Sequence, residues 1–376
     1  MFIKMNPDKI TCLVIGDPHF KVGNVKETDE MCEAIYRVVR EKKPDFIVVL
    51  GDILDRHESI HAAPLCRSVD FLTKLEKLCG EYGTWVLIGN HDMPNNRQFL
   101  TQIHPFTALK HLSEEQKLCI ADTTINRTWK NNKFKFVFVP YVPPGRFVDA
   151  LNTLADGTWT DATAIFAHQE FFGCKMGAII SNEGDKWPLG NPYVISGHIH
   201  DYQEPQTNIL YTGTPMQHAF GDQHHKTISY FEFNVKDGKV ERKHERIDLH
   251  LRKKHLEHIT CTEVSGHIPR NNCDLKIVIT GTSPEIKTIL QHPNIEIWKK
   301  AGHKIVYKDN ATAGEFSAIA SAPRIQITFT QALQNAIAND TQLHLVYQKA
   351  FGQMPNNQIK EEVKPLPMLK LNIQPR

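Results

Sequence analysis

Short runs of apolar residues alternate with amphipathic stretches along the first hundred residues of the chain. Residues 10–15, 46–50 and 85–88 are almost entirely apolar, which is typical of strands that are covered on both faces. The stretches between these runs carry apolar residues at helical spacing. We expect one helix to be capped by Thr28 and the next to open at Pro64. This alternation predicts an α/β fold in which the strand ends meet at one edge of a sheet.

The middle of the chain is richer in strand patterns. Residues 134–139 alternate between apolar and other side chains and stop at a proline, like a strand of a second sheet. Further strands are expected at residues 163–167, 193–196 and 208–211, followed by a hairpin within residues 226–242. The chain is therefore expected to build two sheets before it reaches its C-terminal third.

The C-terminal third divides into a smaller α/β unit and a tail. Strand patterns at residues 275–279 and 303–307 flank a helix that begins near Ser283. The tail is rich in proline and asparagine, and its apolar island at residues 366–371 would either dock a partner or pack back on its own domain. The predicted parts are residues 1–255, 256–345 and 346–376.

The composition excludes several classes of protein. With 41% apolar and 23% charged residues, the chain resembles an ordinary globular protein, and it has no apolar run long enough to span a membrane. The N-terminus lacks the form of a signal peptide, so we expect an intracellular protein. The eight cysteines are scattered without a C-x-x-C pair, which argues against a zinc ribbon. A net charge of +2 neither indicates nor excludes a nucleic-acid partner.

Potential metal ligands follow several of the predicted strands, most of them next to a glycine. Taken singly, each residue is better explained as a turn former or a helix cap. Taken together, carboxylate, imidazole and amide oxygen form a ligand set that suits manganese, iron or zinc, and no thiolate joins it. The candidates are Asp17, His19, Asp52, Asn90, His91, His168, His198 and His200.

The chemistry of such a set requires one ligand that bridges two ions. Two metals about 3.5–4 Å apart are naturally joined by a carboxylate, and Asp52 is the candidate. Such a pair clamps a phosphate oxygen and activates a nucleophile for in-line attack on phosphorus. A histidine that holds no metal would protonate the leaving oxygen or stabilise the transition state, and His91 is the candidate for this role.

Five motifs, in order, resemble those of the calcineurin-like metallophosphoesterase superfamily. They are Asp17-Pro18-His19, Gly51-Asp52, Gly89-Asn90-His91-Asp92, His168 and Gly197-His198-Ile199-His200. The resemblance implies a two-layer β-sandwich flanked by helices, with two divalent ions at one sheet edge, most readily Mn²⁺, with Mg²⁺, Fe²⁺ or Zn²⁺ as alternatives. By motif position, one ion would be held by Asp17, His19, Asp52 and His200. The other would be held by Asp52, Asn90, His168 and His198.

The stretch after the last motif suggests a branch of this superfamily. Residues 211–222 resemble the corresponding segment of the SbcD-type DNA double-strand-break repair nucleases, and the unit after residue 256 stands where those enzymes carry a capping domain. The resemblance implies exonuclease and endonuclease activity on DNA in repair, recombination and replication. It also implies an SMC-like ABC ATPase partner and a homodimer within a heterotetramer.

Three alternatives stay open at the level of sequence. Asp55-Arg56 is similar to a phosphate-holding motif of protein Ser/Thr phosphatases, which favours a phosphatase or a small-molecule phosphodiesterase, although His57 replaces the glycine of that motif. If the chain is not a phosphatase, Arg56 and His57 would contact DNA phosphate or belong to a solvated loop. The excess of basic residues over 236–254 would contact DNA or form a solvated hairpin. A non-catalytic DNA-end binder is a third class, which the complete ligand set disfavours.

Overall fold

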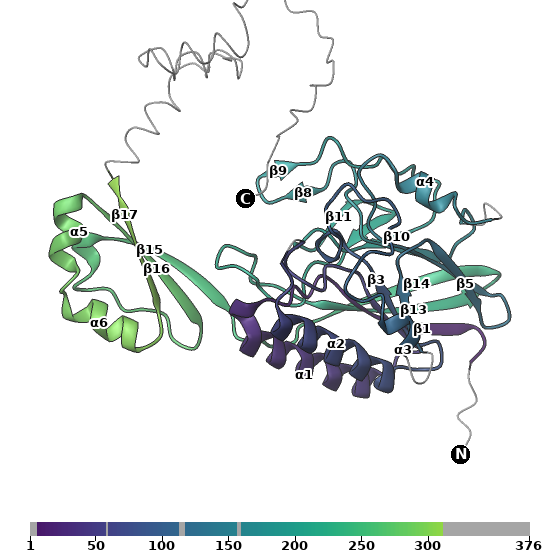
Figure 1. Cartoon of the computed structure of the whole chain (residues 1–376), viewed down its shortest axis with the longest axis horizontal. Helices are drawn as coiled ribbons and strands as arrows, with labels where there is room; N and C mark the ends of the chain where they lie inside the picture. Colours follow the sequence, from purple (N-terminus) through teal and green to yellow (C-terminus); the bar gives the residue numbers. More distant parts are fainter. Residues whose placement is uncertain (1–5, 58, 113–116, 156–158, 311–376) are drawn as a thin grey trace, which may run out of the picture. The chain divides into compact units, whose positions relative to one another are not determined.

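The computed structural model describes residues 6–57, 59–112, 117–155 and 159–310. Two six-stranded mixed sheets dominate it (Figure 1). The first has the strand order β14-β13-β1-β2-β3-β4 and the second β11-β12-β10-β7-β6-β5. The strands of the first sheet are β1 (Lys9–Ile15), β2 (Phe46–Val49), β3 (Thr84–Leu87), β4 (Leu118–Ala121), β13 (Ile228–Lys236) and β14 (Lys239–Ile247).

The second sheet confirms that a separate set of strands begins in the middle of the chain. Its central strands β6, β7, β10 and β12 are parallel to one another, and an antiparallel strand closes each edge. Its strands are β5 (Ile125–Trp129), β6 (Phe134–Val139), β7 (Ala164–Ala167), β10 (Val194–Ser196), β11 (Gln203–Gln206) and β12 (Ile209–Tyr211).

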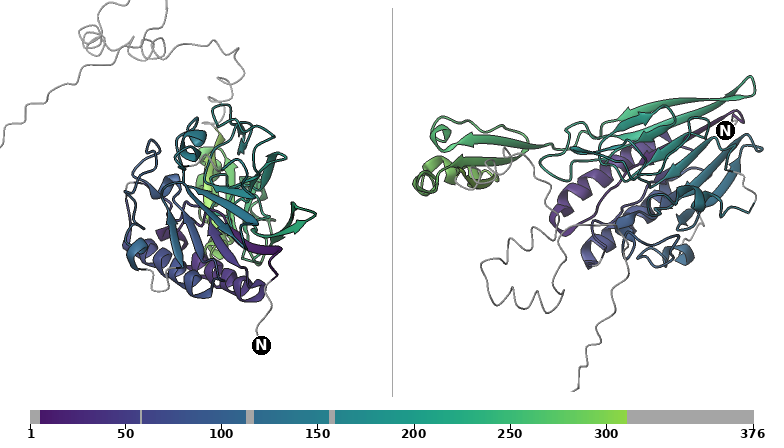
Figure 2. Two further views of the ribbon diagram at one scale, coloured as in Figure 1. Left: turned by 90° about the vertical axis from the view of Figure 1, so that its right-hand side faces the viewer. Right: turned by 90° about the horizontal axis from the view of Figure 1, so that it is seen from above.

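The sheets pack face to face because alternate residues of each strand point to opposite sides. On β1, Val14 faces the second sheet and joins a shared core with Phe136 and Phe166. Its neighbour Leu13 faces the other way and packs with the helices. The second sheet has its own outer core around Phe147. The fold is the predicted two-layer β-sandwich with helices outside it, and Figure 2 shows the layers from two further sides.

The helix predicted near Ser283 begins at that residue, whereas the two earlier helix starts are wrong by four and two residues. The first long helix begins at Val25, and the hydroxyl of Thr28 donates to the carbonyl oxygens of Asn24 and Val25 instead of capping the helix. The second helix begins two residues before Pro64, which is tolerated there because the first turn of a helix needs no backbone donor. The helices of this part are α1 (Val25–Lys42), α2 (Ala62–Leu78), α3 (Leu109–Leu112) and α4 (Phe147–Leu151), with 3-10 turns η1 (Val22–Asn24) and η2 (Asn90–Asp92).

A small three-stranded parallel sheet follows the sandwich. Its strands run in the order β15-β16-β17, and its helices pack through Ile295 and Trp298 on a core that includes Ile277. The predicted boundaries of this unit stay predictions, and the proposed tail lies outside the described residues. The elements are β15 (Lys254–Thr260), η3 (Cys261–Glu263), β16 (Asp274–Gly281), α5 (Ser283–Ile289), α6 (Pro293–Lys300) and β17 (Lys304–Asp309). A two-stranded hairpin in the second third of the chain comprises β8 (Lys175–Met176) and β9 (Ile179–Ile180).

Within the described part of the chain, every helix is too short or too polar to cross a membrane.

Candidate metal centre

The predicted ligands converge where parallel strands of both sheets end. Asp17 and His19 follow β1, and Asp52 follows β2, its neighbour in the first sheet. From the second sheet, His168 follows β7 directly and His198 follows the adjacent β10. Asn90 and His91 follow β3, and His200 lies two residues beyond His198. The carboxyl ends of parallel strands meet at one sheet edge, so residues that are distant in sequence share one site.

The ligands separate into two groups, each within ion-binding distance. One comprises Asp17, His19 and His200, and the other comprises Asp52, His168 and His198; the donor atoms of each group lie within 4.8 Å of one another. These groups match the two ligand sets implied by the motifs, with two differences. Asn90 is in neither group, and Asp52 is in one group instead of both. The roles of the ligands stay predictions.

Asn90 contacts the second group, and Asp52 lies between the two groups. The Oδ1 atom of Asn90 lies 3.0 Å from Nε2 of His168 and 2.9 Å from Nδ1 of His198. The Oδ1 atom of Asp52 lies 3.3 Å from Nε2 of His168, whereas its Oδ2 atom faces His19 at 3.8 Å. Each oxygen of Asp52 therefore points to a different group, as a bridging carboxylate requires.

The buried atoms at this site fit a pair of divalent cations. Both carboxylate oxygens of Asp17 and the Nδ1 atom of His19 are buried and form no hydrogen bond with any described residue. A buried polar group left without a partner costs about 1–3 kcal/mol, so such atoms need an explanation. A cation would supply the missing partner for Asp17, and the mixed carboxylate, imidazole and amide donors suit borderline divalent ions.

The backbone is strained at three of the predicted ligands. His19, Asp52 and His198 have φ angles of 45°, 47° and 77°, in the left-handed region that side chains other than glycine rarely adopt. Strain of this kind persists where the surrounding structure over-determines it, and it is common at active sites. Gly197 is required by space, since a Cβ atom there would lie 2.4 Å from Oδ1 of Asp17.

Burial and mutual charge control the protonation of the ligands. Burial, reinforced by the charge of Asp52, raises the pKa of Asp17 to about 7 although His168 opposes the change. Burial works against the charge on His168, but the neighbouring Asp52 carboxylate raises the pKa of this ring to about 9. Burial lowers the pKa of His198 to about 3, so its ring is neutral and keeps a free electron pair. Metal binding would therefore displace protons from Asp17 and His168.

His91 lies beside both groups without belonging to either. Its backbone N–H donates to Oδ1 of Asp52 over 2.8 Å, and its ring Nδ1 lies 2.8 Å from the backbone oxygen of Asp55. A carbonyl oxygen only accepts, so Nδ1 carries the proton of this hydrogen bond. The Nε2 atom lies 4.0 Å from Oδ2 of Asp52, and the side chain is one-third exposed. This placement suits a group that exchanges a proton with a substrate.

Two site residues were missed at the level of sequence. The carboxylate of Asp92 accepts hydrogen bonds from the backbone N–H groups of Ile53, Leu54 and Gly89, at 3.0–3.2 Å. It therefore holds the Asp52 loop against the Asn90 turn. His218 donates from Nε2 to the backbone oxygen of Asp17 over 3.1 Å. Both lie in stretches that the motifs had already singled out, which was the available signal.

The two predicted substrate contacts lie on the loop after Asp52. The ring of His57 stacks on that of His91, with centroids 4.6 Å apart and planes 14° from parallel. Arg56 is exposed and lines a cavity beside this loop. Neither position tests the predicted contact with phosphate.

A sandwich with six of its predicted ligands in two groups at one edge has the arrangement that a dinuclear metal-dependent hydrolase needs. Residues 10–202 match the family model described as "Calcineurin-like phosphoesterase", and the chain belongs to this family, which uses a dinuclear metal centre. It is accordingly a phosphoesterase of a metal-dependent hydrolase family.

Relatives from two viruses cover most of this chain. "Putative phosphoesterase 078R" of Invertebrate iridescent virus 3 is 43% identical over 283 residues, which are 74% of this chain and 78% of the relative. "Putative phosphoesterase 244L" of Invertebrate iridescent virus 6 is 46% identical over 229 residues, covering 60% of this chain and 77% of the relative. "Uncharacterized metallophosphoesterase YkoQ" of Bacillus subtilis is 28% identical over 107 residues, covering 28% and 34%.

Proposed function

We propose that this phosphoesterase is a DNA nuclease that hydrolyses phosphodiester bonds during DNA end processing, recombination and repair. The observation that supports it best is the position of the segment that resembles the SbcD-type nucleases. His218, in that segment, contacts the backbone of Asp17, and its ring centroid lies 5.0 Å from that of His19. The segment on which the nuclease resemblance rests is thus part of the wall of the metal centre.

The residues of the chain would divide the work of hydrolysis between them. When bound, two divalent ions supply charge that polarises the phosphate and lowers the pKa of water. Asp52 would hold both ions, and the amide oxygen of Asn90 would hold one of them. His91 is anchored through Nδ1 and holds Nε2 4.0 Å from Oδ2 of Asp52, so the protonated ring would donate a proton from Nε2 to the leaving oxygen of the DNA.

We propose Mn²⁺ as the native pair of ions, with Mg²⁺, Fe²⁺ and Zn²⁺ as alternatives. Four histidines among the seven ligands exceed what Mg²⁺ prefers, since this ion favours oxygen donors. The absence of thiolate from the ligand set also disfavours a structural zinc site.

The direct test is a nuclease assay with the full chain on DNA of defined ends. Linear duplex, single-stranded and covalently closed circular DNA would be compared with Mn²⁺, Mg²⁺ or chelator. We expect Mn²⁺-dependent degradation of DNA that has free ends. Turnover of bis(p-nitrophenyl) phosphate without cleavage of any DNA would reject the nuclease function and keep the phosphoesterase.

A phosphatase or small-molecule phosphodiesterase is the second candidate, favoured by the exposed position of Arg56. This guanidinium has no ion-pair partner among the described residues and lines a cavity on the loop after Asp52. Turnover of phosphopeptides or cyclic nucleotides, with no DNA cleavage at the same enzyme and metal concentrations, would support it.

We also propose that the chain works inside cells with an SMC-like ABC ATPase, as a homodimer within a heterotetramer. This rests on the nuclease resemblance. The test is co-expression of the full chain with an SMC-like ATPase encoded in the same genome, followed by size-exclusion chromatography with light scattering. Equimolar co-elution at the mass of a heterotetramer would support the assembly, and separate elution of both proteins would oppose it.

A further inference from the structure

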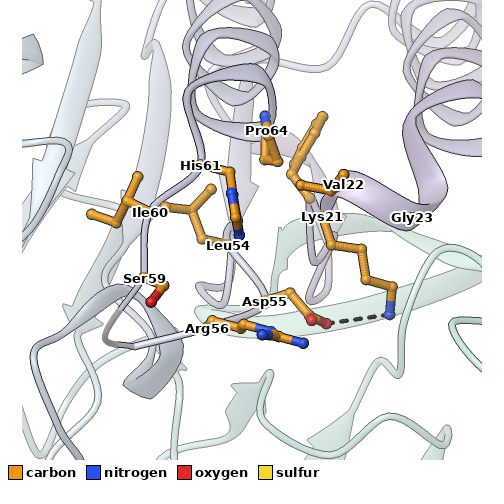
Figure 3. A pocket seen from close by; sticks show the side chains of 11 residues that line it. Lys21, Val22, Gly23, Leu54, Asp55, Arg56, Ser59, Ile60, His61 and Pro64 are labelled. Atoms are coloured by element: carbon orange, nitrogen blue, oxygen red, sulfur yellow. Dashed lines mark hydrogen bonds and ion pairs between the residues drawn. The ribbon is translucent and has the colours of Figure 1, made fainter.

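A cavity of about 270 Å³ opens beside the metal centre, between the loops after β1 and β2. Figure 3 shows the side chains that line it. One wall consists of residues 20–23, directly after the predicted ligand His19, and the other consists of residues 54–56, 59–61 and 64, soon after Asp52. The walls are fixed to each other, because the N–H of Phe20 donates to the backbone oxygen of Ile53 over 2.8 Å.

The cavity is connected to the metal centre through Asp55. One carboxylate oxygen of this residue forms an ion pair with Lys21 at 3.3 Å inside the cavity and lies 3.9 Å from Nδ1 of His19. The backbone oxygen of the same residue accepts the hydrogen bond from His91. Asp55 therefore lies between this cavity and the predicted ligand His19.

The lining combines an apolar interior with a cationic edge. Phe20 and Leu54 are 2% and 4% exposed and form the floor, whereas Ile60 is 49% exposed at the mouth. Lys21 is compensated by Asp55, whereas Arg56 has no ion-pair partner among the described residues and supplies the cationic edge. Apolar walls suit the faces of a planar base, and a guanidinium suits a phosphate that flanks it.

We infer that this cavity, here called the base pocket, receives one unpaired nucleoside of the substrate next to the phosphate that is cleaved. The inference rests on the proposed function and deepens it. A paired base is stacked between its neighbours and enters a pocket only after it leaves the helix, at a cost of a few kcal/mol. The pocket would therefore make the enzyme prefer single strands and frayed ends over paired DNA.

The test compares two esters that differ in the presence of a nucleoside. Thymidine 5′-(p-nitrophenyl phosphate) would reach the base pocket, whereas methyl p-nitrophenyl phosphate carries only a methyl group in place of the nucleoside. The measured quantity is the ratio of kcat/KM for the first ester to kcat/KM for the second, with Mn²⁺. Ile60→Trp, which fills the mouth, should lower this ratio about ten-fold, and Ile60→Ala, which removes a wall, should lower it about three-fold.

The matched control is Ile103→Trp, because Ile103 is 69% exposed and does not line the base pocket. It should leave the ratio at the wild-type value. Unchanged ratios in both Ile60 variants, with DNA cleavage intact in the wild type, would overturn the base pocket and leave the nuclease proposal standing. If the wild type cleaves no DNA but the two Ile60 variants change the ratio as predicted, the nuclease proposal is overturned and a nucleoside site remains.

Discussion

The Nε2 atoms of His19 and His200 lie 3.0 Å apart, although 181 residues separate the two histidines in the chain. Burial lowers the pKa of both rings, which favours neutral imidazoles with free electron pairs. Two such nitrogen atoms facing each other are well placed to share a cation. This pair is the clearest geometric sign of the first ion site.

We expect His200→Ala to reduce bound manganese from about two ions per chain to about one. The reason is that the second group keeps all its ligands. The full-length protein would be stripped with chelator, reloaded, desalted and measured by plasma mass spectrometry. His225→Ala is the control, because His225 is exposed and belongs to neither group. Two ions retained in the His200 variant would remove this residue from the ligand set.

His91→Asn should lower the rate of DNA cleavage by about 10²–10⁴-fold, the usual contribution of a general acid, because the sugar oxygen of DNA leaves poorly without a proton. Its manganese content should stay at the wild-type value, since His91 belongs to neither ligand group. Asp52→Asn is the comparison and should lose both activity and metal. Full activity in the His91 variant would show that another group protonates the leaving oxygen.

Asp92→Ala should destabilise the metal-free protein by about 2–4 kcal/mol, because it leaves three buried backbone N–H groups without an acceptor. Asp92→Asn keeps one acceptor oxygen and should cost less. Urea unfolding in the presence of chelator measures both. Asp149→Ala removes an exposed carboxylate that pairs with Arg146 and should change the free energy of unfolding by less than about 0.5 kcal/mol. If Asp92→Ala and Asp149→Ala changed the free energy of unfolding equally, Asp92 would not be the residue that positions the Asp52 loop.

Stability should also depend on pH through His244, which lies away from the metal centre. Its ring stacks on Phe231 with centroids 4.4 Å apart, and burial lowers its pKa to about 4. The unfolded chain binds a proton below about pH 6.5, whereas the folded ring does not until about pH 4. The stability that this residue contributes is therefore lost as the pH falls from about 6.5 to 4.

The measurement is the urea midpoint of the chelator-treated protein at pH 7.5 and at pH 5. Wild type should lose more stability between these values than His244→Phe, whose ring takes up no proton. His225→Phe, at an exposed position, should behave like wild type. An identical loss in wild type and His244→Phe would contradict the assigned pH dependence.

The sequence determined the elements and the set of ligands, because both depend on local patterns. Continuous apolar runs required covered strands, and glycines beside Asp52 and His198 marked tight turns with room for a metal. Helix starts were predicted less well, since Thr28 bonds back to the preceding turn and only the folded backbone shows this. The local pattern of apolar residues predicts which residues are buried. The residue that caps a helix also depends on the backbone conformation of the residues before the helix.

Only the tertiary structure decided how close the candidate ligands lie to one another and what surrounds them. The family resemblance implied that His19 and His200 belong together, but the 3.0 Å between their Nε2 atoms depends on packing one sheet against the other, which no spacing in the sequence reveals. The same is true of Asp92, whose carboxylate accepts from two loops, and of the cavity between the loops after β1 and β2. A sequence states which chemical groups are present, but distances between groups far apart in the chain arise only when the sheets close over their shared core.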